Sequence, residues 1–227
     1  PAPTPSSERG SGEIDPSVDH SLHVALARRE LKVHFPLMTD SHEKEQAQAL
    51  DLLEDLMGRA KKAGAESADA VLVRGVSLSQ SIRLGKPEHL ERSEGSDIGL
   101  RVFMGKRQAM VSSSDSSAEA LDELALRAVS MARAVPEDPF CGLADPDQLA
   151  TRFPDVDSFD TFEPAADHLS DLASRCEEAA MAVDGVTNSE GGSAGWGTNT
   201  VAMAASSGFA RAYANSSHSL SASVIAG

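Results

Sequence analysis

Two kinds of periodicity alternate along this chain and predict its secondary structure. Leucine, methionine and alanine recur every three or four residues from about Glu43 to Ala63, the spacing of a helix that buries one face. Asp40 and Glu43 resemble a capping box that would start this helix, and Gly64 supplies a stop at its end. We therefore expect an amphipathic helix over residues 43–63.

The segments that follow alternate with a period of two, which is typical of strands with one buried face. Apolar positions alternate with small or polar ones over residues 70–83 and again over residues 98–104. Gly75 stands where the first alternation changes phase, so we expect a bulge or a tight turn there. Residues 85–87 and 105–106 read as turns. Together these segments predict an antiparallel meander.

Two further helices and a final strand region follow. Ser116 and Glu119 resemble a capping box that starts a second helix. Residues 136–163 are rich in proline, aspartate and phenylalanine and predict an extended connection across the surface. Pro164 is expected to open a third helix, in a position where its missing N–H costs nothing. After Gly185 a strand pattern runs to the end of the sequence.

The order helix then strands thus occurs twice, which predicts an α+β protein with helices packed on antiparallel β-meanders. Because the strand pattern stops without a closing element, and because the sequence begins with proline, we expect a partial gene product with Met38 as its natural start. The predicted organisation is a disordered or non-native extension over 1–37, an N-terminal α+β domain over 38–140, an extended connection over 141–163, and a truncated second unit over 164–227.

The composition of the chain, and above all its net charge, excludes some classes of binding partner. The net charge is −15, from 35 acidic and 20 basic side chains, which argues against direct binding to nucleic acid or to an anionic membrane surface. No apolar run approaches the roughly 20 residues that span a bilayer, and no signal-peptide pattern is present. The two cysteines, Cys141 and Cys176, fit unrelated reduced thiols. We expect a cytoplasmic protein.

No catalytic or metal-binding motif emerges from the residues. His42 begins like a zincin helix, but Gln46 stands where the second histidine of the same helix face would be. The aspartates of residues 155–160 lack the glycine and the glutamate of a calcium loop. The glycines of residues 191–197 lack the lysine of a phosphate loop and fit hairpin turns better. We therefore assign no catalytic residue and no metal ligand.

The last strand does offer a binding surface. Because strand side chains alternate, Ser217, Ser219, Ser221 and Ser223 line one face, and His218 lies on the other. A face of small hydroxylated residues tolerates close approach of another backbone, and an exposed strand edge can accept an extended peptide. Peptide binding by these five residues and a bare sheet face whose covering half is absent remain equally good interpretations.

Several ungapped strings, in the right order, resemble the TldD/PmbA family. They are residues 83–104, the following KRQAMVSSSD with its helix, and the glycine- and serine-rich strings within residues 185–227. The resemblance covers roughly residues 45–227 and is closer to the PmbA branch, also called TldE.

This resemblance implies a cytosolic α+β protein of a kind historically called a modulator of DNA gyrase. It also implies that a TldD-type catalytic subunit pairs with a TldE-type subunit to form a peptidase that degrades unfolded peptides. In that family a HExxxH motif of the TldD-type subunit holds zinc, and this chain has no such string. We therefore expect a non-catalytic subunit without a cofactor of its own, in a heterodimer or a homodimer. The alternative is a regulatory binding protein that acts on gyrase without proteolysis.

Overall fold

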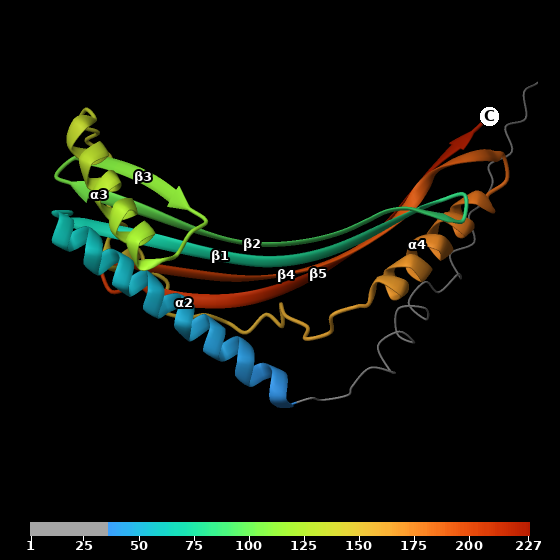
Figure 1. Ribbon diagram of the computed structural model, residues 1–227, viewed down its shortest axis with the longest axis horizontal. Helices are drawn as coiled ribbons and strands as arrows, with labels where there is room; N and C mark the ends of the chain where they lie inside the picture. The colour runs from blue at the N-terminus through green and yellow to red at the C-terminus, as the bar shows by residue number, and fades with distance from the viewer. Residues whose placement is uncertain (1–35) are drawn as a thin grey trace, which may run out of the picture. The chain divides into compact units, whose positions relative to one another are not determined.

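The computed structural model describes residues 36–227, with side chains from His42 onward (Figure 1). The predicted extension over 1–37 therefore lies, except for its last two residues, outside the described residues. The elements in chain order are α2 (Pro36–Ala63), β1 (Ser67–Arg83), β2 (Lys86–Met104), β3 (Arg107–Ser113), α3 (Ala118–Ala134), the 3₁₀ helix η1 (Pro146–Gln148), α4 (Ala166–Met181), β4 (Val186–Ala205) and β5 (Ala210–Ala226).

All of these strands belong to one antiparallel sheet with the order β3-β2-β1-β4-β5. The central pair is β1 with β4, which runs without a register shift from Asp69 opposite Ala205 to Ile82 opposite Gly192. This pair joins the strands of the two predicted helix-then-strands units into a single sheet. The α+β class is confirmed.

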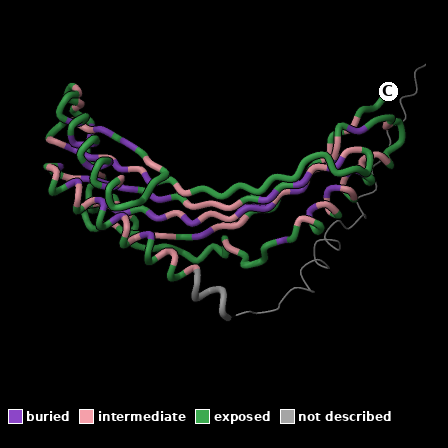
Figure 2. Tube along the Cα trace, viewed as in Figure 1, coloured by how far each residue is buried: buried purple, intermediate pink, exposed green. Residues whose placement is uncertain are grey.

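The helices all pack on one face of this sheet. Even-numbered residues of β1 and β4, such as Leu72 and Ala202, join the buried side chains of α2 and α3 in one hydrophobic cluster. Farther along the same face, Leu169 and Ala173 of α4 form a second cluster with Ile82 and neighbouring apolar side chains. We call this the covered face and the opposite one the open face. Burial follows this alternation along much of β1 and β4, whereas the first half of β2 and most of β5 are exposed (Figure 2).

The helix starts differ from those predicted. Helix α2 begins at Pro36, so residues 39–41 have helical backbone and the predicted capping box at its start is wrong. Proline suits the first turn of a helix, which explains the earlier start. The N-cap of α3 is Ser117, whose side chain accepts from the Ala120 N–H, one residue later than predicted. Helix α4 begins at Ala166 rather than at the proline two residues before it.

The predicted bulge at Gly75 is wrong, because β1 continues through this residue in regular pairing. Val71 and Val73 produced the apparent change of phase. They are apolar, yet they lie on the open face and are 38% and 39% exposed. A Cβ on Gly75 would lie 2.5 Å from Oδ1 of Asn199, so the glycine leaves room for that side chain.

The turns are placed partly as predicted. The β2–β3 turn at Gly105 and Lys106 is confirmed. The β1–β2 turn lies at Leu84 and Gly85, whose φ angles of 49° and 71° match a two-residue hairpin turn, and β2 already begins at the next residue. The glycines of residues 191–197 are not turns, because they lie inside β4.

Other expectations concern the loops and cysteines. Between α3 and α4 the chain has no regular structure apart from η1. Cys141 and Cys176 are both free. Within residues 36–227 we find no helix that combines the length and the apolar character needed to cross a membrane.

One buried carboxylate ties α4 to the β1–β2 turn. Glu177 is 3% exposed and accepts hydrogen bonds from the backbone N–H groups of Leu84 and Gly85, at 2.8 and 3.1 Å, and from the Ser189 hydroxyl. Burial alone raises the pKa of Glu177, but these three hydrogen bonds and the nearby Arg83 outweigh burial and hold the pKa below its ordinary value. The charged form is therefore the one that the fold stabilises.

We predict that Glu177→Gln lowers the free energy of unfolding by about 1–3 kcal/mol at neutral pH, because buried donors lose a charged acceptor. Since the pKa of Glu177 is lower in the folded state, this contribution is complete above the ordinary pKa of glutamate. It is lost as the pH falls through the folded pKa. Urea unfolding at a series of pH values measures it. The exposed neighbour Glu178, changed to Gln, is the matched control. Equal stability losses for the two variants would show that the hydrogen bonds of Glu177 do not stabilise the fold.

Candidate functional site

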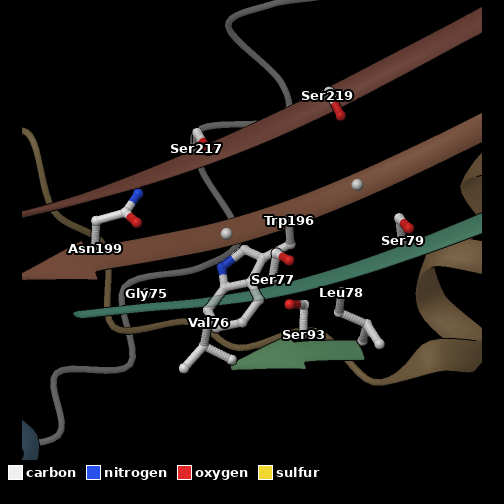
Figure 3. A pocket seen from close by; sticks show the side chains of 12 residues that line it. Gly75, Val76, Ser77, Leu78, Ser79, Ser93, Trp196, Asn199, Ser217 and Ser219 are labelled. Carbon is white, nitrogen blue, oxygen red and sulfur yellow. The ribbon is translucent and has the colours of Figure 1, made fainter. Parts of the chain in front are cut away.

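A shallow depression of about 460 Å³ lies on the open face where β2, β1, β4 and β5 run side by side (Figure 3). We call it the serine trough. Most of its side chains are small, and hydroxyl groups supply most of its polar atoms. Its lining residues are Gly75, Val76, Ser77, Leu78, Ser79, Ser93, Gly195, Trp196, Gly197, Asn199, Ser217 and Ser219.

Strand register explains why these residues meet. Gly197 lies opposite Ser77 of β1 on one side and opposite Ser217 of β5 on the other. Two residues along, Gly195 lies between Ser79 and Ser219 in the same way. Directly opposite residues of an antiparallel sheet point to the same face. Each row therefore places two hydroxyl groups beside a glycine, where the backbone of β4 is bare.

The hydroxyl groups of the trough are free to bond a ligand. The Ser219 hydroxyl leans over its neighbour, because a Cβ on Gly195 would lie 2.7 Å from its Oγ. Within the described part of the chain, the trough serines form no side-chain hydrogen bond. Ser221, one row beyond, does pair, with its Oγ 2.9 Å from Oγ of Ser193. The side chains of Val76, Leu78 and Trp196 pack on the covered face, so the trough presents unpaired polar groups and few bulky side chains.

The predicted peptide-binding residues fall into two groups. All five are exposed on β5, and the four serines share the open face as expected. Ser217 and Ser219 line the trough, whereas Ser221 and Ser223 lie beyond it. His218 lies on the covered face, opposite Trp196 of β4. A peptide-binding role for these residues stays a prediction.

Sequence reasoning missed the contribution of the other strands. Ser77 and Ser79 of β1 recur with the same spacing of two as the serines of β5. That shared spacing was a usable signal, but it does not say that β4 lies between the two serine rows. Asn199 and Ser93 carry no signal of this kind.

The outer edge of β5 is available for pairing. The Ser216 N–H donates to the carbonyl of Ser158 at 2.9 Å. The backbone N–H and C=O of Ser216 therefore point away from β4. Because these directions alternate along a strand, His218, Leu220 and Ala222 also present N–H and C=O groups outward. Beyond Ser216, no backbone group among residues 36–227 pairs with this edge of β5.

The opposite edge of the sheet is protected in a way that β5 is not. The part of β2 that extends past β3 carries proline and charged side chains, which discourage pairing with another strand. These residues are Lys86, Pro87, Glu88, Glu91, Arg92 and Glu94. By contrast, residues 212–227 contain no aspartate, glutamate, lysine or arginine. The edge of β5 is therefore the one able to accept another strand.

The zinc site that the family resemblance implies for a partner subunit has no counterpart among these side chains. From residue 42 onward, no three histidine, cysteine, aspartate or glutamate side chains lie close enough to hold a metal ion. The described residues do not fit a zinc ion, and we derive no catalytic step for them.

The fold and the site together define an α+β sheet protein with one open face, polar at the serine trough, and one unprotected strand edge. Comparison with protein families is consistent with this class. Residues 68–132 match the PmbA/TldA metallopeptidase domain 1, and residues 159–227 match the PmbA/TldA metallopeptidase central domain. The chain belongs to the PmbA/TldD family.

Individual relatives agree with this assignment. The chain is 33% identical over 162 residues to the metalloprotease PmbA of Escherichia coli O157:H7, a match that covers 71% of this chain and 36% of the relative. It is 33% identical over 188 residues to a metalloprotease PmbA homologue of Haemophilus influenzae, a match that covers 82% of this chain and 41% of the relative. The chain thus spans well under half the length of these curated relatives.

Solved structures share the fold. A crystal structure from Bacteroides thetaiotaomicron, described as a modulator of DNA gyrase, superimposes with a TM-score of 0.70 at 21% identity, covering 78% of this chain and 40% of that one. TldE from Thermococcus kodakarensis superimposes with a TM-score of 0.64 at 16% identity, covering 77% of this chain and 39% of that one. At these identities the likeness concerns the fold alone.

Two glycines of β4 test the assignment of the faces. We predict that Gly197→Ala leaves the free energy of unfolding unchanged or raises it slightly, because the added methyl group meets only ordinary contacts on the open face. Gly192→Ala should lower it by about 1–3 kcal/mol, because its methyl group would overlap the Ala173 carbonyl of α4. Chemical denaturation of both variants measures this. Equal losses would show that the two residues do not lie on opposite faces.

Proposed function

We propose that this chain is part of a non-catalytic, PmbA/TldE-type subunit that binds unfolded peptides for a zinc-dependent peptidase partner of the TldD type in the cytoplasm. The observation that carries this proposal is the unpaired, uncharged edge of β5, which continues into the serine trough. Membership of the PmbA/TldD family supports a role in peptide hydrolysis.

The edge of β5 suits a substrate without a fixed sequence. Backbone groups of His218, Leu220 and Ala222 would pair with the backbone of an extended peptide, as in other cases of β-augmentation. A folded protein has few free extended segments, since its backbone groups are already paired. Selection by backbone pairing therefore favours unfolded chains over folded ones.

The serine trough suits the side chains of such a peptide. In strand pairing, alternate side chains of the added strand lie over the same face of the sheet. Those on the open face would lie beside Ser217 and Ser219, where small residues leave space and free hydroxyl groups offer hydrogen bonds. A polar surface without a deep pocket discriminates little between side chains, which is what a general peptide-binding subunit requires.

The proposed division of labour places the metal chemistry in the partner. Zinc bound by the TldD-type subunit would supply the Lewis acid that polarises the scissile carbonyl. This chain would hold and align the peptide, which lowers the barrier by positioning rather than by bond chemistry.

Mixing this chain with a TldD-type subunit tests the proposal. We expect hydrolysis of an unstructured peptide by the pair and not by this chain alone. Leu220→Pro should lower kcat/KM about tenfold or more, because proline removes an outward N–H and obstructs pairing at the edge. Proline is tolerated on an edge strand when its nitrogen faces outward. The measurement is the rate of peptide cleavage, followed by chromatography.

Two further variants serve as controls. Leu220→Lys leaves the backbone unchanged and should impair cleavage by charging the edge. Leu90→Lys makes the same change on the already charged strand β2 and should leave cleavage unchanged. If the pair cleaves no peptide, the subunit role is wrong. If it cleaves but tolerates both Leu220 variants, the β5 edge is not the peptide site.

A regulatory protein that binds DNA gyrase without proteolysis is the competing function, since one structural relative is described as a modulator of DNA gyrase. Stoichiometric retention of gyrase, together with no cleavage by the mixed subunits, would favour it.

A further inference from the structure

A second cleft lies on the covered face, in the interval between α2 and α4. The connection before α4 crosses the sheet here. It is fixed at β5 by a hydrogen bond from the Ser216 N–H to the Ser158 carbonyl, and at β2 by an ion pair between Glu163 and Arg92 at 2.8 Å. We call residues 158–163 the strap. Between the strap, the start of α2 and the sheet lies a space of about 510 Å³, which we call the strap cleft.

Two of the three glutamates that line the strap cleft already pair with an arginine. Glu94 and Glu163 both pair with Arg92, at N–O distances of 2.8 Å. Glu45 lies 3.6 Å from Nδ1 of His42, whose ring packs edge-on against Phe159 of the strap. Arg92 therefore offsets part of the negative charge at the rim of the cleft.

The Thr198 hydroxyl donates to the Asn215 carbonyl at 3.2 Å, but other donors of the strap cleft lack partners among the described residues. Trp196 is 6% exposed, and its indole N–H makes no hydrogen bond. Its side chain packs near Val76 on the covered face (Figure 3). The Arg74 guanidinium, on β1, forms no ion pair or hydrogen bond with any other described residue. Thr200 is 5% exposed and its hydroxyl donates to no other described residue.

The indole N–H of Trp196 is a buried donor without an acceptor, which is costly because it loses its hydrogen bond to water without replacement. Beside it lie the half-buried guanidinium of Arg74 and the hydroxyl of Thr200. All of them are satisfied by an acceptor that carries negative charge. A guanidinium binds a carboxylate or a phosphate through two parallel hydrogen bonds. The glutamates at the rim disfavour a doubly charged phosphate more than a singly charged carboxylate.

We propose that the strap cleft binds a carboxylate group, held by Arg74 and the indole N–H of Trp196. The carboxylate belongs to a small molecule or to the C-terminus of a peptide. The strap cleft is separate from the β5 edge and lies on the face of the sheet opposite the serine trough. The carboxylate proposal therefore does not depend on the proposed peptide-binding function.

The sole tryptophan of the chain provides a direct measurement. The indole N–H signal in ¹H–¹⁵N NMR spectra belongs to Trp196 alone. We expect it to shift and saturate on titration with N-acetyl-dialanine bearing a free carboxylate, and to stay unchanged with the same compound as its C-terminal amide. A titration with acetate shows whether the carboxylate belongs to a small molecule or to a peptide C-terminus. Binding as tight as that of the peptide acid indicates a small carboxylate, and weaker binding indicates a peptide C-terminus.

Variants test the role of the guanidinium. Arg74→Gln should weaken binding of the acid about tenfold or more, since a hydrogen-bonded ion pair is lost. Arg175→Gln, an exposed arginine of α4 that already pairs with Asp171, should leave it unchanged. An equal shift with acid and amide, tighter binding of inorganic phosphate, or no shift at all would overturn the proposal. The comparison of acid with amide uses the unaltered chain, so it tests carboxylate binding even if Arg74→Gln fails to fold.

Discussion

The pairing of β1 with β4 is the interaction on which the rest of this structure depends. These strands lie more than 100 residues apart in the sequence and yet pair without interruption from Asp69 to Ile82. Closing so long a loop has an entropic cost, which regular pairing and the burial of alternate side chains offset. The same register sets the rows of the serine trough, and it brings Arg74 of β1 and Trp196 of β4 to one cleft.

A sheet covered on one face only has two surfaces with different chemistry. On the covered face, apolar side chains meet three helices, and the polar groups within it are either bonded, as Glu177 is, or left as donors in the strap cleft. On the open face, glycine and serine replace bulky residues over the middle of four strands. Little apolar area is buried there, so this part of the sheet contributes less to stability and is available for contact with another chain.

Much of the fold could be predicted from local patterns. The alternation of β1 and of β5 indicated the strands, and the helical stripe after Glu43 indicated α2. The errors arose where a local signal had a second meaning. Val71 and Val73 are apolar but exposed, which suggested a false bulge at Gly75.

The candidate site was less predictable, because it depends on contacts distant in sequence. The serines of β5 were recognised, but β4 separates them from those of β1, and nothing in the sequence reports that pairing. Gly195 and Gly197 suggested turns, although they lie inside β4 and keep the open face bare. No local pattern marks Glu177 or Arg74. Their environments follow only from where α4 and the strap cross the sheet.

The central claim is that the outer edge of β5 accepts the backbone of an extended peptide. Amide hydrogen exchange tests it residue by residue. Without peptide, the outward amides of His218, Leu220 and Ala222 should exchange faster than those of Ser217, Ser219 and Ser221, which point to β4. With an unstructured peptide present, the outward amides should become protected and the inward ones should change little. Outward amides that remain unprotected while the peptide binds would contradict the account.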